Sequence, residues 1–134
     1  MPAPGVLRIL LVEDSLPVRR RIRSLIEEFL PAAILGEAGT VADALAYFRA
    51  QPLDAVVLDL NLADGDGCDV LCEIKRTRPT CVVLVLTNHD LPGMRELCLQ
   101  EGADHYFIKS REFERVPEVP ATLGGSPGAS ATAA

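Results

Sequence analysis

The stretch of residues 54–62 constrains the fold of this chain more than any other. Three consecutive apolar residues at positions 56–58 lead directly to the carboxylate of Asp59, and turn-forming residues follow at positions 63–67. An apolar run with such bounds is typical of a strand that is buried on both faces of a parallel sheet. We therefore expect Asp59 to lie at the carboxyl end of a strand, at the rim where open α/β sheets bind ligands.

Four further apolar runs have the length and the bounds of strands. They cover residues 6–12, 33–38, 81–86 and 104–108. Between the runs, apolar residues recur with helical spacing, as do Val18, Ile22, Leu25, Ile26 and Phe29 in the first such segment. This alternation favours a parallel sheet with right-handed crossovers. We predict an α/β fold, a doubly wound five-stranded parallel sheet with the flavodoxin-like order 2-1-3-4-5.

Capping residues and prolines mark the helix ends. The expected N-caps of the first, second, fourth and fifth helices are Ser15, Thr40, Asp90 and Ser110. The inward side chains of the last two helices are expected to be Met94, Leu97, Cys98, Phe113 and Val116. Pro117 and Pro120 interrupt the fifth helix, and an interior proline costs about 3 kcal/mol. We expect this helix to be shortened to one or two turns.

The chain has the length of one domain, with 134 residues and a net charge of −6. We assign residues 1–5 to an N-terminal extension, 6–120 to the folded domain and 121–134 to a flexible tail rich in Gly, Ser and Ala. No apolar run reaches the ~18 residues that span a bilayer, and the chain begins without a signal-peptide pattern. We expect a cytoplasmic protein without membrane or nucleic-acid partners.

Four cysteines are expected to be reduced, structural thiols. They are Cys68, Cys72, Cys81 and Cys98. No pair has CxxC spacing, and His89 and His105 complete no recognisable zinc pattern with them. Reduced thiols agree with a cytoplasmic compartment.

Polar side chains at the expected strand ends form one chemical set. Glu13 and Asp14 follow the first strand, and Asp59, Thr87 and Lys109 end the third, fourth and fifth. In the predicted order these ends converge on one rim. Three carboxylates held together repel unless a cation joins them, and oxygen ligands suit a hard cation such as Mg²⁺. A metal and a lysine beside an aspartate suit phosphoryl transfer through an aspartyl phosphate.

This set, in this order, resembles the receiver domains of two-component response regulators over about residues 6–116. The resemblance implies that Asp59 is phosphorylated by a histidine kinase or a phosphotransfer protein in the presence of Mg²⁺. It implies metal binding by Glu13, Asp14, Asp59 and the backbone carbonyl of Asn61. It further implies phosphoryl contacts from Thr87, Asn88 and Lys109, and a conformational switch formed by Thr87 and Tyr106.

The resemblance also implies how a signal leaves the domain. Phosphorylation is expected to remodel the face formed by the fourth helix and the fifth strand, which would bind a downstream protein or form a weak dimer of an otherwise monomeric chain. Only 25 residues follow Lys109, too few for a helix-turn-helix output domain. We expect a stand-alone switch that catalyses nothing beyond its own phosphorylation and dephosphorylation.

Three positions differ from the usual family pattern, and two other functions remain open. Ser110 and Ala63 stand where proline is common, and Asn88 where alanine or serine is usual, which bears on loop geometry and phosphate lifetime. One alternative is a docking module that works without phosphorylation, although the acidic set is intact. The other is a metal-dependent phosphatase, although no acid stands two residues after Asp59 and no substrate cap is present.

Two further sequence patterns are weak evidence for function. Residues 59–65 faintly resemble a calcium-binding loop but lack the ligand spacing and the preceding helix of an EF-hand. Arginines at positions 19, 20, 21 and 23 form either a solvated helix face or a docking patch for an acidic partner.

Overall fold

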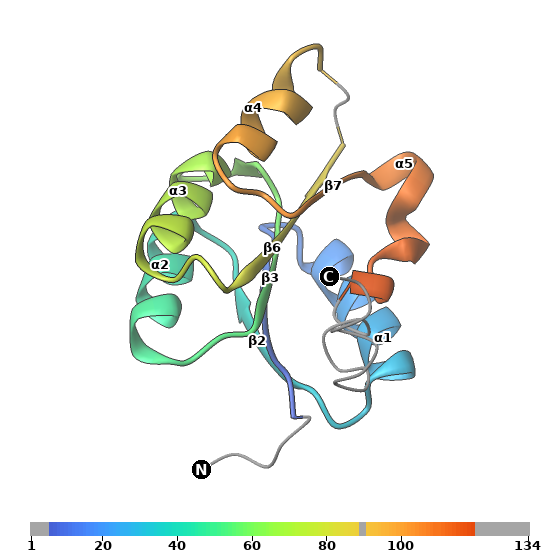
Figure 1. The fold of residues 1–134 in the computed structure, drawn as a ribbon. Helices are drawn as coiled ribbons and strands as arrows, with labels where there is room; N and C mark the ends of the chain where they lie inside the picture. Colours follow the sequence, from blue (N-terminus) through green and yellow to red (C-terminus); the bar gives the residue numbers. More distant parts are fainter. Residues whose placement is uncertain (1–5, 89–90, 120–134) are drawn as a thin grey trace, which may run out of the picture.

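A five-stranded parallel sheet runs through the centre of the molecule (Figure 1). The computed structural model describes residues 6–88 and 91–119. The strands are β1 (Arg8–Val12), β2 (Ile34–Ala38), β3 (Ala55–Leu58), β6 (Val82–Thr87) and β7 (His105–Ile108). They lie in the order β2-β1-β3-β6-β7, which is 2-1-3-4-5 for the strands of this sheet. The predicted fold class and strand order are confirmed, with strand bounds that differ by one or two residues.

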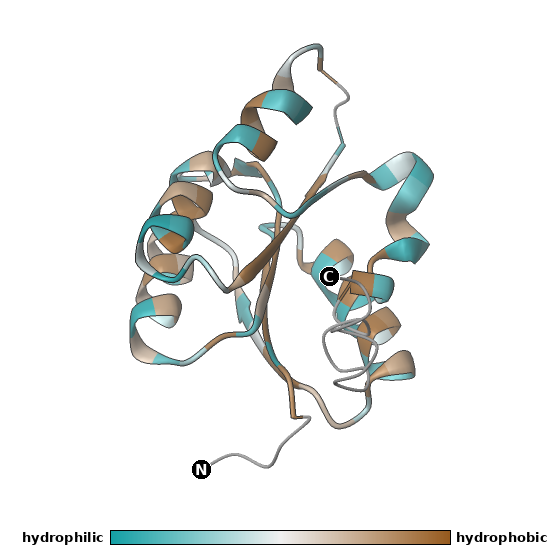
Figure 2. Cartoon of the chain, viewed as in Figure 1, coloured by the Kyte–Doolittle hydropathy of each residue, from teal (hydrophilic) through white to brown (hydrophobic). Residues whose placement is uncertain are grey.

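Helices cover both faces of the sheet (Figure 1). On one face lie α2 (Val41–Ala50), α3 (Gly67–Thr77) and α4 (Met94–Gln100). On the other lie α1 (Leu16–Phe29) and a C-terminal segment made of α5 (Lys109–Glu112) and the 3-10 turn η1 (Phe113–Arg115). Hydropathy follows this layering, since apolar residues concentrate on the strands and on the inward helix faces (Figure 2). Among the described residues, no helix has the length and hydropathy needed to cross a membrane.

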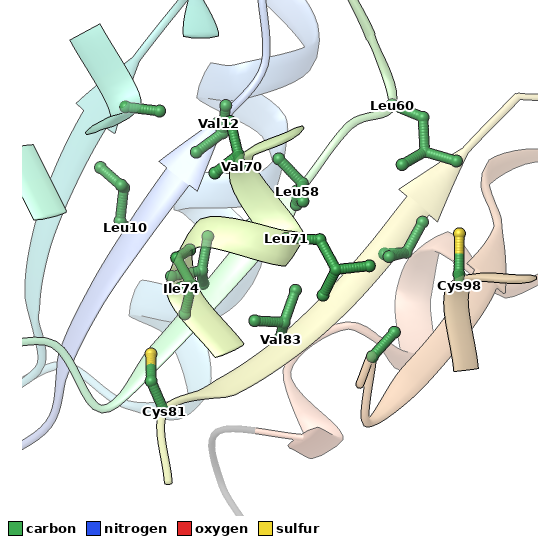
Figure 3. Close-up of a cluster of buried hydrophobic side chains, with 14 of the residues drawn as sticks. Leu10, Val12, Leu58, Leu60, Val70, Leu71, Ile74, Cys81, Val83 and Cys98 are labelled. Carbon is green, nitrogen blue, oxygen red and sulfur yellow. The ribbon is translucent and has the colours of Figure 1, made fainter. Parts of the chain in front are cut away.

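Alternate side chains of each strand fill two separate cores. Leu10 and Val56 point toward α2 and α3, whereas Ile9, Leu11 and Val57 point toward α1. In the first core, α3 places its buried face against β3 and β6, as Figure 3 shows for Leu71, Ile74, Leu58 and Val83. Full burial of a side chain of this size contributes roughly 1.5–3 kcal/mol.

The first two helices begin at the predicted N-caps. The hydroxyl of Ser15 accepts a hydrogen bond from the backbone N–H of Val18 at 3.4 Å, and that of Thr40 accepts from Asp43 at 3.0 Å. Of the apolar residues with helical spacing in α1, Ile22 and Ile26 are buried, but Phe29 is 60% exposed. Phe29 is the last residue of α1, about one turn beyond buried Ile26 and half-buried Leu25, which pack on the sheet.

Helix α4 buries fewer side chains against the sheet than the sequence predicted. Its predicted cap, Asp90, lies outside the described residues; the helix follows Gly93, whose φ of +80° is in the left-handed region. Cys98 is the buried residue of this seven-residue helix, and Met94 is half-buried. The prediction that Leu97 faces inward is wrong, since it is 44% exposed. Two turns present too narrow a face to bury three side chains.

The C-terminal segment is short, as predicted. Helix α5 has four residues and continues as a single 3-10 turn. Phe113 and Val116 are buried, which confirms their predicted packing. Ser110 is not the N-cap: α5 begins after Ile108 without a side-chain cap. The predicted extension at residues 1–5 and the tail at 121–134 lie outside the described residues.

The loop after β3 contains a small hairpin that the sequence pattern did not predict. Strands β4 (Asn61–Leu62) and β5 (Gly65–Asp66) pair antiparallel, and α3 begins immediately after them. A two-residue strand is too short to show an alternating pattern. Gly67 packs so closely on the preceding chain that a Cβ there would lie 2.3 Å from the carbonyl oxygen of Asp59.

Candidate functional site

Three carboxylates meet at the carboxyl ends of β1 and β3. Val12 pairs with Leu58 in adjacent parallel strands, so Glu13, Asp14 and Asp59 leave the sheet side by side. One carboxylate oxygen of each lies within 4.8 Å of the others. Glu13 and Asp59 are buried, at 2% and 5% exposed, whereas Asp14 is exposed. The acidic cluster that the sequence predicted is therefore assembled, and its donor set fits a divalent cation.

Lys109 reaches into this cluster from the end of β7. Its Nζ lies 2.5 Å from Oε1 of Glu13 and 3.5 Å from Oδ2 of Asp59. The lysine side chain is only 9% exposed, so water screens these contacts weakly. One ammonium thus faces two buried carboxylates, and the site keeps an excess of negative charge.

Burial dominates the ionisation of Glu13. Loss of water raises the pKa of its carboxyl, and the nearby charge of Asp59 raises it further. Hydrogen bonds from Lys109 and from the N–H of Ser15 at 3.1 Å act in the opposite direction without cancelling the rise. A cation bound beside these groups would favour the charged form of Glu13.

The predicted switch residues are buried close to this rim. Thr87 ends β6, and both Thr87 and Tyr106 are 2% exposed. The guanidinium of Arg95 lies 4.8 Å from the centre of the Tyr106 ring, and its Nη1 donates to the Tyr106 carbonyl at 3.0 Å. Asn88, the next residue after Thr87, is exposed. A cavity of 280 Å³ lies beside Thr87, between the β4–β5 hairpin and the start of α4.

Backbone hydrogen bonds hold the loop that follows Asp59. Asn61 donates its N–H to Oδ1 of Asp59 at 3.2 Å, and Gly67 donates to the carbonyl of Leu60 at 2.9 Å. Asp66 caps α3 by accepting from the N–H of Cys68 at 2.9 Å. These bonds fix both ends of the segment that joins Asp59 to α3.

The contacts of Arg19 with the site and with Glu37 were not expected from the sequence. Its Nη1 donates to the backbone carbonyl of Glu13 at 2.6 Å, and its Nε contacts Glu37 at 2.7 Å. Arg23 binds the other carboxylate oxygen of Glu37, also at 2.7 Å. Half of the basic run is thus engaged in ion pairs, in contrast to the solvated face that was one interpretation. The partner of both arginines is Glu37, a single acid on β2. Spacing along the sequence does not indicate that this acid lies beside α1.

The cysteines are free, as predicted. Cys81 and Cys98 are buried, Cys68 is half-buried, and Cys72 donates to Glu101 at 3.1 Å. Burial raises the pKa of Cys81 to about 11, and the hydrogen bond to Glu101 raises that of Cys72 to about 11. Thiols with such pKa values are poor nucleophiles and weak metal ligands at neutral pH.

The order of strands, the acidic cluster and the buried lysine occur together in a known protein family. Residues 9–119 match the response regulator receiver domain family. The chain belongs to this family. Receiver domains of response regulators act in two-component signalling, and the cluster of Glu13, Asp14 and Asp59 fits a divalent metal site in such a domain.

Curated relatives are longer than this receiver domain. It is 29% identical over 114 residues to the nitrate/nitrite response regulator protein NarP of Escherichia coli (strain K12), covering 85% of this chain and 53% of NarP. It is 30% identical over 118 residues to the photosynthetic apparatus regulatory protein RegA of Cereibacter sphaeroides, covering 88% of this chain and 63% of RegA. The chain therefore spans between half and two thirds of these two relatives.

Solved structures share the fold. The phosphorylated cyanobacterial phytochrome response regulator RcpA superposes with a TM-score of 0.79 at 26% identity, covering 87% of this receiver domain and 93% of RcpA. The Mn²⁺-bound form of response regulator Rcp1 superposes with a TM-score of 0.78 at 26% identity, covering 90% and 96%.

Proposed function

We propose that this receiver domain is a phosphoacceptor switch in which Asp59 receives a phosphoryl group. The observation that carries the proposal is the convergence of three carboxylates and Lys109 on one rim of the sheet. The donor would be the phosphohistidine of a histidine kinase or of a phosphotransfer protein. The structures of phosphorylated RcpA and of Mn²⁺-bound Rcp1 support the same chemistry.

The residues divide the work of phosphoryl transfer. An oxygen of Asp59 attacks phosphorus, a P–O bond forms as the P–N bond of the donor breaks, and the electron pair leaves with the imidazole, which takes up a proton. Glu13, Asp14, Asp59 and the Asn61 carbonyl would hold Mg²⁺, which neutralises charge on the phosphoryl oxygens. Lys109 and the Thr87 hydroxyl would contact those oxygens, and exposed Asn88 would limit water access from outside.

The output would be a change of the protein surface. We assign it to the face formed by α4 and β7, where Leu91, Leu97 and Leu99 are exposed at 53%, 44% and 45%. A downstream protein, or a second copy in a weak dimer, would bind this face; nucleic acid would not. Reduced thiols agree with work in the cytoplasm. The folded unit is assigned to residues 6–120, in agreement with the match over 9–119.

The acceptor can be tested directly. Incubation with acetyl phosphate and Mg²⁺ should add one acid-labile phosphoryl group by mass spectrometry, and Asp59→Asn should abolish it. Asp69→Asn, which removes an exposed carboxylate on α3, is the matched control and should label normally. Equal labelling of Asp59→Asn would overturn the assignment. No labelling of the wild type would favour the docking module, and repeated turnover of phosphate esters would favour the phosphatase.

A further inference from the structure

Both carboxylate oxygens of Asp64 bind the first turn of a distant helix. Oδ1 accepts from the N–H of Val41 at 2.7 Å, and Oδ2 accepts from the N–H of Ala42 at 3.1 Å. Val41 and Ala42 are the first residues of α2, whereas Asp64 lies in the turn of the β4–β5 hairpin. The contact therefore joins segments that are 23 and 22 residues apart in the chain.

This arrangement favours a charged carboxylate. The first N–H groups of a helix lack partners within the helix and carry its positive partial charge. The hydrogen bond from Val41, supported by that from Ala42, lowers the pKa of Asp64 below its ordinary value. The hairpin also sits close against the helix start, because a Cβ on Gly65 would lie 3.4 Å from Cγ2 of Val41.

The hairpin is part of the loop that joins Asp59 to α3. Asn61 begins β4, two residues after Asp59, and pairs with Asp66 across the hairpin. Hydrogen bonds of Asn61 and Asp66 tie the two ends of the loop to Asp59 and to α3, and residues 63–65 between them are exposed. Ala63 leaves its own φ unrestricted, where a proline would fix it. Asp64 supplies the anchor for the middle of this segment.

We propose that Asp64 is a positioning residue for the phosphorylation site. By tying the hairpin to α2, it holds the Asn61 carbonyl where a divalent cation beside Asp59 requires it. The inference rests on the proposed function and adds a residue that touches neither the cation nor the phosphoryl group. Asp64 acts on the Asn61 carbonyl through the hairpin and not through a direct hydrogen bond. Asp64→Ala should therefore weaken Mg²⁺ binding, by less than the roughly 10-fold that loss of a direct partner of a metal ligand costs. It should also speed amide hydrogen exchange in residues 61–66.

Thr40→Ala is a matched control. The hydroxyl of Thr40 caps the same helix by accepting from Asp43 at 3.0 Å, but it does not contact the hairpin through a described hydrogen bond. Both variants should lower the melting temperature by a similar amount. Asp64→Asn, which keeps one oxygen acceptor and loses the charge, should give an intermediate Mg²⁺ affinity.

The experiment is a calorimetric Mg²⁺ titration together with hydrogen exchange of the full chain. Weaker Mg²⁺ binding and faster hairpin exchange in Asp64→Ala alone would support the inference. Equal weakening by Thr40→Ala would overturn it, because the effect would then come from α2 stability in general. Unchanged affinity and exchange in Asp64→Ala would also overturn it. Failure of acetyl phosphate to label wild-type Asp59 would defeat the proposed function instead, and the exchange comparison would still decide the role of Asp64.

Discussion

At the scale of single residues, the two members of the acid pair have different surroundings. Glu13 is buried and accepts hydrogen bonds from Lys109 and Ser15, whereas Asp14 is exposed at the mouth of the site. A buried carboxylate that already accepts hydrogen bonds from two donors is less available to a cation than an exposed carboxylate. The direct and the supporting role in metal binding should follow this difference.

Substitution of the two acids should reveal that order. Asp14→Ala should weaken Mg²⁺ binding severely, by more than the roughly 10-fold that loss of a ligand's outer partner costs, because it removes the accessible ligand itself. Glu13→Gln should weaken it less, since Lys109 already neutralises part of that charge. Calorimetric titration of both variants measures the ratio. A larger loss for Glu13→Gln would show that the roles are reversed.

Lys109 should oppose metal binding while it stabilises the metal-free protein. Removal of one partner from a buried ion pair leaves an uncompensated charge and typically costs 3–5 kcal/mol. Lys109→Met should therefore lower the free energy of unfolding by about 3 kcal/mol without Mg²⁺, and it should tighten Mg²⁺ binding. Urea unfolding at several Mg²⁺ concentrations tests both effects, because a ligand of the folded state stabilises it by mass action. Weaker Mg²⁺ binding in this variant would contradict the electrostatic account.

At the scale of elements, Glu37 joins β2 to α1 through Arg19 and Arg23. The hydrogen bond from Arg19, with the charges of both arginines, holds the pKa of Glu37 below its ordinary value of 4.5. A lowered acid pKa contributes stability that is complete above the unfolded pKa and disappears as the pH falls through the folded pKa. This network should thus stabilise the protein at neutral pH and fail in acid.

The comparison of Glu37→Gln with wild type over pH 3–7 tests the sign. The variant should be less stable by about 1 kcal/mol at pH 7, a usual size for a partly exposed ion pair. The difference in unfolding free energy should shrink below pH 4.5 and vanish at the acid end. A difference that stays constant with pH would show that packing, and not charge, accounts for the loss.

Helix α4 should be the element that responds to phosphorylation. It is anchored by buried Cys98 and by the contacts of Arg95 with Tyr106, and it begins without a side-chain cap. A beryllofluoride phosphate mimic should change hydrogen exchange in residues 88–96 and 104–113 more than in α1. Protection that changes only around Asp59 would indicate a phosphate sink without a conformational signal. The response expected of α4 is a population shift between two packings of the helix.

At the scale of the whole molecule, the sequence predicts what depends on chain order and misses what depends on proximity. Apolar runs and their polar ends gave five strands and one functional rim, because parallel strands align their carboxyl ends. The contacts of Arg19 with Glu37 and of Asp64 with α2 join residues 18 to 23 positions apart, and no periodic pattern encodes them. The exposure of Phe29 and Leu97 likewise depends on where each helix meets the sheet.

From the net charge of −6, we predict that the molecule as a whole binds nucleic acid poorly. No sequence-specific DNA binding is expected of this chain at physiological salt, measured by fluorescence anisotropy with a labelled duplex. Binding that weakens steeply with added salt would reveal a phosphate-contacting surface and change the output class.

The tight contact at Gly67 has a genetic consequence. Any side chain at this position would meet the Asp59 carbonyl and push α3, with Leu71 and Ile74, away from the acceptor strand. Gly67 is therefore required both for the position of Asp59 and for the packing of α3 in the core. A library randomised at that codon and selected for acetyl phosphate labelling should return glycine alone, whereas the neighbouring exposed position 69 should return many amino acids.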